Sequence, residues 1–256
     1  MIDIHAHILP QVDDGPNDWQ DTIALLKQGI ADGIQGVVCT SHVLNQLDDR
    51  LEGSFLLKFD QLKEQIQKHD LKIDVWLGSE IHSHSDFRRE SKVATINGHG
   101  KYMLIEFPMS NVPADAGKLF FDLSITGTTP ILAHPERNAG LLKNPEQLFE
   151  LVQRGILMQM NASSLTGRFG KEVKRFAYTM MEQDWVHFVA SDCHSTESRP
   201  MILSEAYNLI AKEWGREKAE ACFVKNPMAA VNGEPVETPH PKELKKKKRG
   251  LFSFGS

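Results

Sequence analysis

Long apolar runs are missing from the sequence, and cysteine is scarce. A helix that crosses a bilayer needs about 20 consecutive apolar residues, and no stretch of the chain has that character. Asp3 and His5 interrupt the start of the chain, so we expect no signal peptide. The three cysteines, Cys39, Cys193 and Cys222, are widely spaced and odd in number. That pattern argues against a disulfide framework and predicts a protein of the reducing cytoplasm.

Outside one short segment, acidic residues outnumber basic ones. The formal net charge is −5, but residues 242–249 hold six basic residues and one acid, a net of +5, which leaves −10 on the rest of the chain. A body this acidic is a poor general binder of nucleic acid, because the phosphate backbone favours basic surfaces. We therefore expect no nucleic-acid partner.

Short strand-like segments that run into metal-ligand residue types are the most informative feature that the chain does have. Its 256 residues and 41% hydrophobic content suffice for one large α/β domain. Segments with strand character cover residues 1–4, 36–40, 73–78, 102–105, 129–133, 156–160 and 187–191. All but one run into a histidine, aspartate or glutamate, and the exception ends at Asn161.

Amphipathic segments alternate with these strands. Apolar residues recur at helical spacing in residues 19–30 and 55–66, and later helices are expected over 115–126, 144–154, 170–183, 202–213 and 215–224. Alternating strands and helices predict a parallel sheet. Convergent metal ligands favour its closure into a distorted, TIM-barrel-like (β/α)7 barrel of seven strands. We expect this domain to span residues 1–225, followed by a linker over 226–241 and a basic disordered tail over 242–256.

The residues at the strand ends predict a polynuclear metal site. In a parallel barrel the carboxyl ends of all strands open on one face, so side chains from six strands would meet there. His5 and His7 would lie on the same side of an extended segment, and a carboxylate such as Glu80 after apolar residues is costly unless paired or metal-bound. Mixed imidazole and carboxylate sets suit Mn, Fe or Zn. The strand-end candidates are His5, His7, His42, Glu80, Glu106, His134, Asp192 and His194.

Two cations follow these candidates closely. Arg137 comes three residues after His134, and Arg199 comes five residues after His194. Both could reach the mouth of the same site, and a guanidinium can fork onto two phosphoryl oxygens.

These residues resemble the polymerase-and-histidinol-phosphatase (PHP) superfamily, and more narrowly its bacterial tyrosine-protein phosphatases of capsule and exopolysaccharide gene clusters. The resemblance covers about residues 1–225, in order and at similar spacing. The family often shows a Thr-Pro-His-His tract, and here Ser41 and Val43 replace the proline and the second histidine. The motifs that carry the resemblance are His5-Ala6-His7, Asp13-Asp14-Gly15, Thr40-Ser41-His42, Gly78-Ser79-Glu80, Glu106-Phe107-Pro108, Ala133-His134-Pro135-Glu136-Arg137 and Ser191-Asp192-Cys193-His194.

The resemblance implies three divalent ions, Mn²⁺ first and Fe or Zn as alternatives. The implied ligand sets are His5, His7, Glu80 and Asp192 for the first ion, Glu80, Glu106 and His134 for the second, and Asp14, His42 and His194 for the third. Arg137 and Arg199 would hold the phosphoryl oxygens. With Asp192, they are the catalytic candidates.

The resemblance also implies a reaction and a partner. The expected activity is metal-dependent hydrolysis of phosphotyrosine on the tail of a membrane-associated bacterial tyrosine kinase that controls capsular or exopolysaccharide synthesis. The basic tail, with Leu251, Phe252 and Phe254 after its lysines, combines cationic and apolar residues that suit an anionic membrane surface.

Three alternatives remain open at this point. A small phosphate monoester such as histidinol phosphate could replace phosphotyrosine as the substrate of the same metal site. Cys193 and Arg199 have the C-x5-R spacing of cysteine-dependent phosphatases, although the intervening segment has no glycine and contains Glu197. A non-catalytic, metal-bound regulatory domain would show degenerate ligands, and none is missing here.

Overall fold

The computed structural model describes residues 1–88 and 90–244, and within these ranges every pairing between strands is parallel. One sheet has the order β1-β2-β5, a second has the order β11-β10-β9-β8-β6-β3, and β4 pairs with β7 alone. The strands are β1 (Ile2–Ala6), β2 (Gly36–Cys39), β3 (His42–Val43), β4 (Gln46–Leu47), β5 (Asp74–Leu77), β6 (Glu80–His82), β7 (Asp86–Phe87), β8 (Tyr102–Glu106), β9 (Thr129–Ala133), β10 (Leu157–Asn161) and β11 (Phe188–Ala190). This confirms an α/β fold with parallel sheets.

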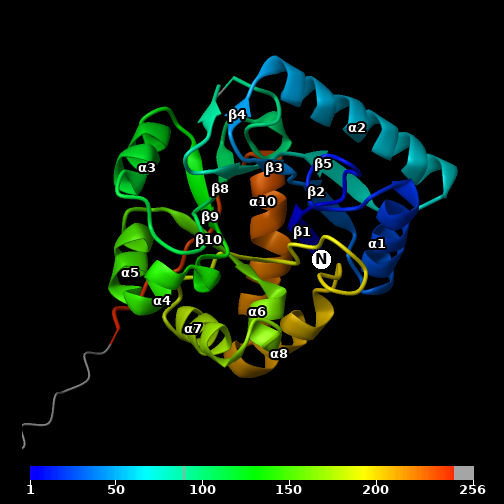
Figure 1. Cartoon of the computed structure of the whole chain (residues 1–256). Helices are drawn as coiled ribbons and strands as arrows, with labels where there is room; N and C mark the ends of the chain where they lie inside the picture. Colours follow the sequence, from blue (N-terminus) through cyan, green and yellow to red (C-terminus); the bar gives the residue numbers. More distant parts are fainter. Residues whose placement is uncertain (89, 245–256) are drawn as a thin grey trace, which may run out of the picture.

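Helices connect the strands and surround them. In Figure 1, α1, α2, α3, α5, α7 and α8 lie outside the strands, and α10 overlaps the middle of the strand assembly in this view. The helices are α1 (Trp19–Ala31), α2 (Asp49–Lys68), the short η1 (Ile96–Gly98), α3 (Ala116–Ser124), the short η2 (Pro135–Arg137), α4 (Ala139–Lys143), α5 (Pro145–Gln153), α6 (Ala162–Thr166), α7 (Lys171–Glu182), α8 (Ser204–Trp214), α9 (Arg216–Glu220), the π-helical η3 (Ala221–Lys225) and α10 (Asn226–Asn232).

Local sequence explains where the first helices begin and end. The side chain of Asp18 accepts a hydrogen bond from the backbone N–H of Asp21, and Asp48 does the same for Leu51, so each caps a helix amino end. After α1, Gly33 takes a left-handed conformation with φ of +90°, which glycine adopts without strain. Both helices then turn apolar residues inward, among them Leu26 and Phe55.

The first and last long strands meet at their carboxyl ends. The N–H of His7 donates to the carbonyl of Cys193 at 2.9 Å, and the N–H of Asp192 donates to the carbonyl of His5 at 2.9 Å. Ala6 and Cys193 form an isolated parallel bridge. Residues near the start of the chain are therefore neighbours of residues 192–193 at one end of the strand assembly.

One apolar cluster fills the space among the strands and continues into α10. Its strand residues alternate along the sequence, for example Tyr102 with Leu104 in β8, as expected for one face of a strand. Ala230 and Val231 of α10 belong to this cluster and are buried. The members are Ile2, Ile4, Val38, Ile96, Tyr102, Leu104, Ile131, Ala133, Leu157, Phe188, Ala190, Ala230 and Val231.

Helix α10 covers the amino ends of the strands. It occupies residues 226–232, where the sequence analysis expected a linker. The side-chain amide of Asn226 donates to the carbonyl of His187 at 2.9 Å, just before β11 begins. The Tyr102 hydroxyl, at the start of β8, donates to the carbonyl of Glu234 at 2.6 Å. Residues 226–232 therefore form a packed helix, because Pro227 is compatible with a first helical turn and Val231 is buried.

The packed chain also continues into the expected tail. The Lys242 N–H donates to the carbonyl of Gln183 at 2.8 Å, and the Trp185 indole donates to the carbonyl of Lys242 at 3.0 Å. Leu244 packs against the core. Residues 245–256, which hold most of the basic and apolar tail, lie outside the described residues. Over the described residues, no helix is both long and apolar enough to cross a bilayer.

Candidate metal centre and phosphate site

The structure brings all the candidate residues to the carboxyl ends of the strands. They come from six segments, in or just after six parallel strands, so the parallel topology brings them together. The residues and their elements are His5 in β1, His7 and Asp14 after β1, His42 in β3, Glu80 in β6, Glu106 at the end of β8, His134 and Arg137 after β9, and Asp192, His194 and Arg199 after β11.

Glu80 lies at the centre of the cluster and is fully buried. Its Oε2 atom lies 3.1 Å from His5 Nε2, 3.2 Å from His7 Nε2 and 3.1 Å from His42 Nδ1. Its Oε1 atom lies 3.0 Å from His134 Nε2, which is also 3.6 Å from Glu106 Oε1. One carboxylate thus contacts four imidazoles.

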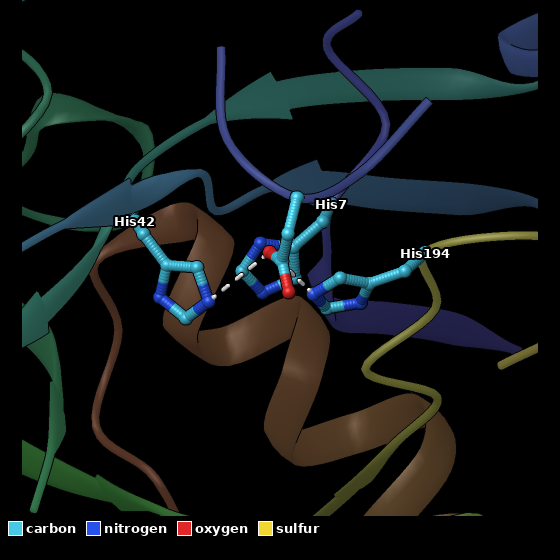
Figure 2. Close-up of side chains that lie close together, drawn as sticks. His7, His42 and His194 are labelled. Carbon is cyan, nitrogen blue, oxygen red and sulfur yellow. Dashed lines mark ion pairs between the residues drawn. The ribbon is translucent and has the colours of Figure 1, made fainter. Parts of the chain in front are cut away.

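A second group forms at the open side of the cluster. Asp14 Oδ1 lies 3.1 Å from His194 Nε2 and 3.5 Å from His42 Nε2. Figure 2 shows His7, His42 and His194 turned toward one another from different parts of the chain, and the rings of His7 and His194 stack with centroids 4.0 Å apart. Asp14 is the exposed member of the set, with 65% of its side chain accessible.

Hydrogen bonds fix which imidazole nitrogens carry lone pairs. His5 Nδ1 lies 2.8 Å from the Gln159 amide oxygen, and His7 Nδ1 lies 2.8 Å from Asp13 Oδ2. Both partners are acceptors, so each Nδ1 donates and each Nε2 is free to act as a ligand. The two Nε2 atoms are 3.1 Å apart and both face Glu80 Oε2, which accepts no hydrogen bond within the described chain. Lone pairs that converge in a buried site require a cation, so the residues fit divalent metal ions.

Three polar residues that the sequence analysis did not single out as functional support the cluster. Asp13 Oδ2, besides holding His7, accepts the backbone N–H of His42 at 3.0 Å. Gln159 donates to Asn161 at 3.0 Å, and Asn161 donates to Asp192 Oδ2 at 2.7 Å. The signal for the last two is their spacing of two and four residues from Leu157, which puts all three side chains on the same face of β10. Asn161 was the exception among the strand ends and still contacts the candidate ligands.

Asp192 joins this cluster to both arginines. Its Oδ2 accepts from Arg137 Nη1 at 3.1 Å, and its Oδ1 forms an ion pair with Arg199 Nη2. Asp192 and His134 both have left-handed backbones, with φ of +54° and +31°, an unusual conformation outside glycine that is often found at functional sites. Arg199 Nη1 also lies 2.9 Å from His194 Nε2. The Nε2 atom can accept a hydrogen bond from Arg199 or bind a metal ion, but it cannot do both at once.

The pKa values of the cluster reflect burial together with neighbouring charges, which oppose burial at His7 and reinforce it at Glu106 and His194. Burial lowers the pKa of His7, but its hydrogen bond to Asp13 and the negative charges of Asp13 and Glu80 outweigh burial and raise that pKa to about 10. Burial, with Glu80 nearby, raises the pKa of Glu106 to about 7. Burial, with His7 nearby, lowers the pKa of His194 to about 4. The carboxylates favour positive charge at His7, which either a proton or a metal ion would supply.

Grouping by distance differs in part from the implied ligand sets. The third set, Asp14, His42 and His194, lies together, and His7 lies within the same group. His5 and His7 group with Glu80, but Asp192 groups with His5 and His134. Glu106 groups with Glu80 and His42. The same nine residues are involved, and His5, His7, His42 and Glu80 each belong to two groups.

Cys193 does not suit the cysteine-phosphatase alternative. Its side chain is fully buried in a second and larger cluster of apolar residues, which also includes Leu26 and Phe55. Burial, reinforced by Asp3, raises the pKa of its thiol well above the usual value, which disfavours the nucleophilic thiolate. A groove of about 580 Å³ does lie beside the 194–199 loop, but the lining that it shares with the cluster is Asp14, His194 and Arg199, and Cys193 takes no part in it.

Comparisons with known proteins place this geometry in a family. The family model for capsular polysaccharide synthesis proteins, CpsB/CapC, matches residues 1–232. The tyrosine-protein phosphatase YwqE of Bacillus subtilis is 35% identical over 99% of this chain and 100% of its own length. The tyrosine-protein phosphatase CpsB of Streptococcus pneumoniae is 33% identical over 90% of this chain and 98% of its own length.

A solved structure gives the same result in three dimensions. It belongs to work on YwqE from Bacillus subtilis and CpsB from Streptococcus pneumoniae, described as unique metal-dependent tyrosine phosphatases. It superposes with a TM-score of 0.88 at 33% identity and covers 96% of this chain and 100% of the solved chain. The chain therefore belongs to the CpsB/CapC family of capsular polysaccharide synthesis proteins.

Proposed function

We propose that this protein is a metal-dependent protein-tyrosine phosphatase. The observation that carries the proposal is one cluster of five histidines and four carboxylates, buried except at Asp14 on its open side, with two arginines on Asp192. The substrate is the phosphotyrosine tail of a membrane-associated tyrosine kinase that controls capsular or exopolysaccharide synthesis. Such a substrate is cytoplasmic, so the same location is proposed for the enzyme.

The scaffold proposed for this site is the seven-stranded barrel expected from the sequence. The strand assembly has seven members if β2 with β3, and β5 with β6, are each one interrupted strand. Backbone hydrogen bonds at the interruptions support this view. The Gly78 N–H donates to the carbonyl of Cys39 at 2.9 Å, and the Glu80 N–H donates to the carbonyl of Ser41 at 3.1 Å. The bridge between Ala6 and Cys193 would close the barrel.

The proposed cofactors are three divalent ions, most simply Mn²⁺, held by the five histidines and by Asp14, Glu80, Glu106 and Asp192. Three such ions bring six positive charges against four carboxylates, which suits a phosphate dianion. When bound, divalent ions polarise a phosphoryl group and lower the pKa of a coordinated water toward about 7.

The chain's own residues bind and orient the phosphate. Arg137 and Arg199 present guanidinium groups beside Asp192, where they would bind phosphoryl oxygens and stabilise the charge that spreads over them in the transition state. Asp13 and Gln159 hold His7 and His5 in the tautomers that ligation needs. A phenolate leaving group, with a pKa of about 10, needs less protonation than a serine alkoxide. The site therefore favours phosphotyrosine without a strong general acid.

A parallel assay on a phosphotyrosine peptide, a phosphoserine peptide and histidinol phosphate, each with added Mn²⁺, tests this function. We expect the phosphotyrosine peptide to be the best substrate by kcat/KM, activity to be lost in chelator, and Cys193→Ser to remain active. Faster hydrolysis of histidinol phosphate would identify a small phosphate monoester as the substrate instead. Chelator-resistant turnover would contradict the metal centre.

We also propose that the basic tail contacts anionic membrane near the kinase. Removal of residues 245–256 tests this proposal without disturbing Lys242 and Leu244, which pack against the body. We expect unchanged activity on a soluble peptide and weaker binding to anionic vesicles at low salt. Equal vesicle binding by the full and shortened proteins would remove the tail from the mechanism.

A further inference from the structure

A four-residue loop, Gly167 to Gly170, lies beside the phosphate site and has no role in the functions above. It connects α6 to α7, and both of its glycines have left-handed backbones, with φ of +95° and +93°. Glycine adopts this conformation readily and other residues rarely do, so the pair fixes a tight turn. Between them the loop presents Arg168 and Phe169.

Phe169 contacts the first of the two candidate phosphate-binding arginines. The Cζ atom of Arg137 lies 4.3 Å from the centroid of the Phe169 ring. A guanidinium that stacks on an aromatic face keeps its N–H edge free for planar acceptors such as carboxylate or phosphate. Arg137 uses part of that edge on Asp192. The ring therefore restricts the guanidinium to one plane without occupying its donors.

Arg168 contacts the segment that carries the second arginine. Its Nη1 atom donates to the carbonyl of Glu197 at 3.3 Å and to the carbonyl of Ser198 at 3.0 Å. These carbonyls immediately precede Arg199, whose own carbonyl accepts from the N–H of His194 at 2.9 Å. Arg168 thus ties the Arg199 segment to the same loop that supports Arg137.

We propose that the 167–170 loop positions both arginines for the phosphate, with Phe169 acting on Arg137 and Arg168 acting on Arg199. Neither loop residue is a catalytic residue, because each acts through its arginine. The inference rests on the proposed phosphate-binding role of Arg137 and Arg199. The 167–170 loop is then the element that sets the positions of these two arginines.

A double-mutant cycle between Phe169 and Arg137 tests the first half. The measured quantity is the inhibition constant of inorganic phosphate, determined with Mn²⁺ and with bound metal quantified for each variant. We expect Phe169→Ala and Phe169→Leu to weaken phosphate inhibition about three- to tenfold, as for loss of a partly desolvated cation–π contact. Phe169→Tyr, which keeps the ring face, should have the same inhibition constant for phosphate as the wild-type protein. In the Arg137→Ala background, Phe169→Ala should have little further effect.

Arg168 is tested in the same way against Arg199. Arg168→Ala should weaken phosphate inhibition in the wild-type background and have little effect in the Arg199→Ala background. Arg175→Ala removes the same charge from an exposed position on α7 and is the matched control. Phe121→Ala, on the exposed face of α3, is the control for loss of a phenyl ring. Both controls should leave the inhibition constant unchanged.

The outcomes separate this inference from the function on which it rests. If Arg137→Ala and Arg199→Ala weaken phosphate inhibition but the loop variants do not, the loop has no positioning role and the arginine assignment stands. If the loop effects are the same with and without each arginine, they do not act through those arginines and the inference is wrong. If neither arginine variant changes phosphate inhibition, the phosphate role of the arginines and the loop inference are both wrong.

Discussion

Gln159 is a buried amide whose hydrogen bonds link three candidate metal ligands. Its oxygen accepts from His5 Nδ1 at 2.8 Å and from the backbone N–H of His134 at 3.3 Å. A backbone N–H can only donate, so the amide orientation is fixed and its nitrogen must face Asn161, which in turn donates to Asp192. One amide therefore sets the tautomer of His5 and, through Asn161, the orientation of Asp192.

We predict that Gln159→Met, which keeps the length of the side chain and removes its acceptor, lowers Mn²⁺ affinity about 10- to 100-fold, the usual effect of losing a ligand's supporting hydrogen bond. Isothermal titration with Mn²⁺ gives the affinity. Gln153→Met, at an exposed position on α5, is the control. An unchanged Mn²⁺ affinity in Gln159→Met would show that His5 is oriented by other contacts.

His187 predicts a pH dependence of stability. Burial lowers the pKa of His187 to about 4, and its Nδ1 accepts the N–H of Met158 at 3.0 Å. Above a pH of about 6.5, the usual pKa, the residue is neutral in the folded and unfolded chain. As the pH falls from there to about 4, only the unfolded chain takes up the proton, so the free energy of unfolding decreases, by roughly 3 kcal/mol in total. Below that range no further loss is expected from this residue.

Denaturant unfolding of wild type and His187→Asn across this pH range measures the effect. The asparagine keeps an acceptor near Nδ1 and does not titrate, so the variant should lose less stability between pH 6.5 and 4. Parallel pH profiles for the two proteins would mean that the folded protein accommodates the imidazolium.

Among single residues, the convergence of the strand-end candidates could be predicted because a parallel fold places every carboxyl end on one face. Glu80, His134 and Asp192 are such cases. Asn161 was set apart because an amide is a weak metal-ligand signal, although it contacts Asp192. Phe169 could not be found from sequence, because its contact with Arg137 crosses 32 residues and follows no local pattern.

Helix α10 is the element whose sequence was misread. Proline and glycine suggested a linker, yet Pro227 lies in the first turn of the helix and Gly233 ends it with φ of +69°. Composition cannot separate a linker from a short helix whose ends carry these residues. Burial decides, because Ala230 and Val231 complete the apolar cluster among the strands.

A truncation series tests the importance of α10. A chain that ends at residue 225 would expose the amino ends of the strands and lose the bonds from Asn226 and Glu234 to the strands. We expect it to lose on the order of 5 kcal/mol, enough to unfold a marginally stable domain. A chain that ends at residue 244 keeps every described contact and should melt like the full protein. Cooperative unfolding of the 225-residue chain at the wild-type temperature would contradict this role.

For the whole molecule, the cluster concentrates carboxylates that a bound cation would neutralise, so metal binding and folding should be linked. At a Mn²⁺ concentration about a thousand times the dissociation constant, linkage stabilises the fold by about 4 kcal/mol, or roughly 10 °C in Tm for a chain of this size. We therefore expect chelator to lower Tm by about that amount and Mn²⁺ to restore it. Glu80→Gln, which removes the central carboxylate, should abolish most of this response. Equal Tm values for wild type in chelator and in Mn²⁺ would rule out the linkage.

The contact between β1 and the segment after β11 has a consequence for synthesis on the ribosome. His5 and Asp192 lie 187 residues apart in the chain, yet the Asp192 N–H bonds to the His5 carbonyl at 2.9 Å. No nascent chain can complete the cluster until Asp192 and His194 have left the exit tunnel, and contacts of such long range also form slowly. His5 and His7 emerge first and wait for most of translation with only part of their final surroundings. A complete metal site would therefore report that almost the whole strand assembly has been made, and premature termination would yield chains unable to hydrolyse phosphate monoesters.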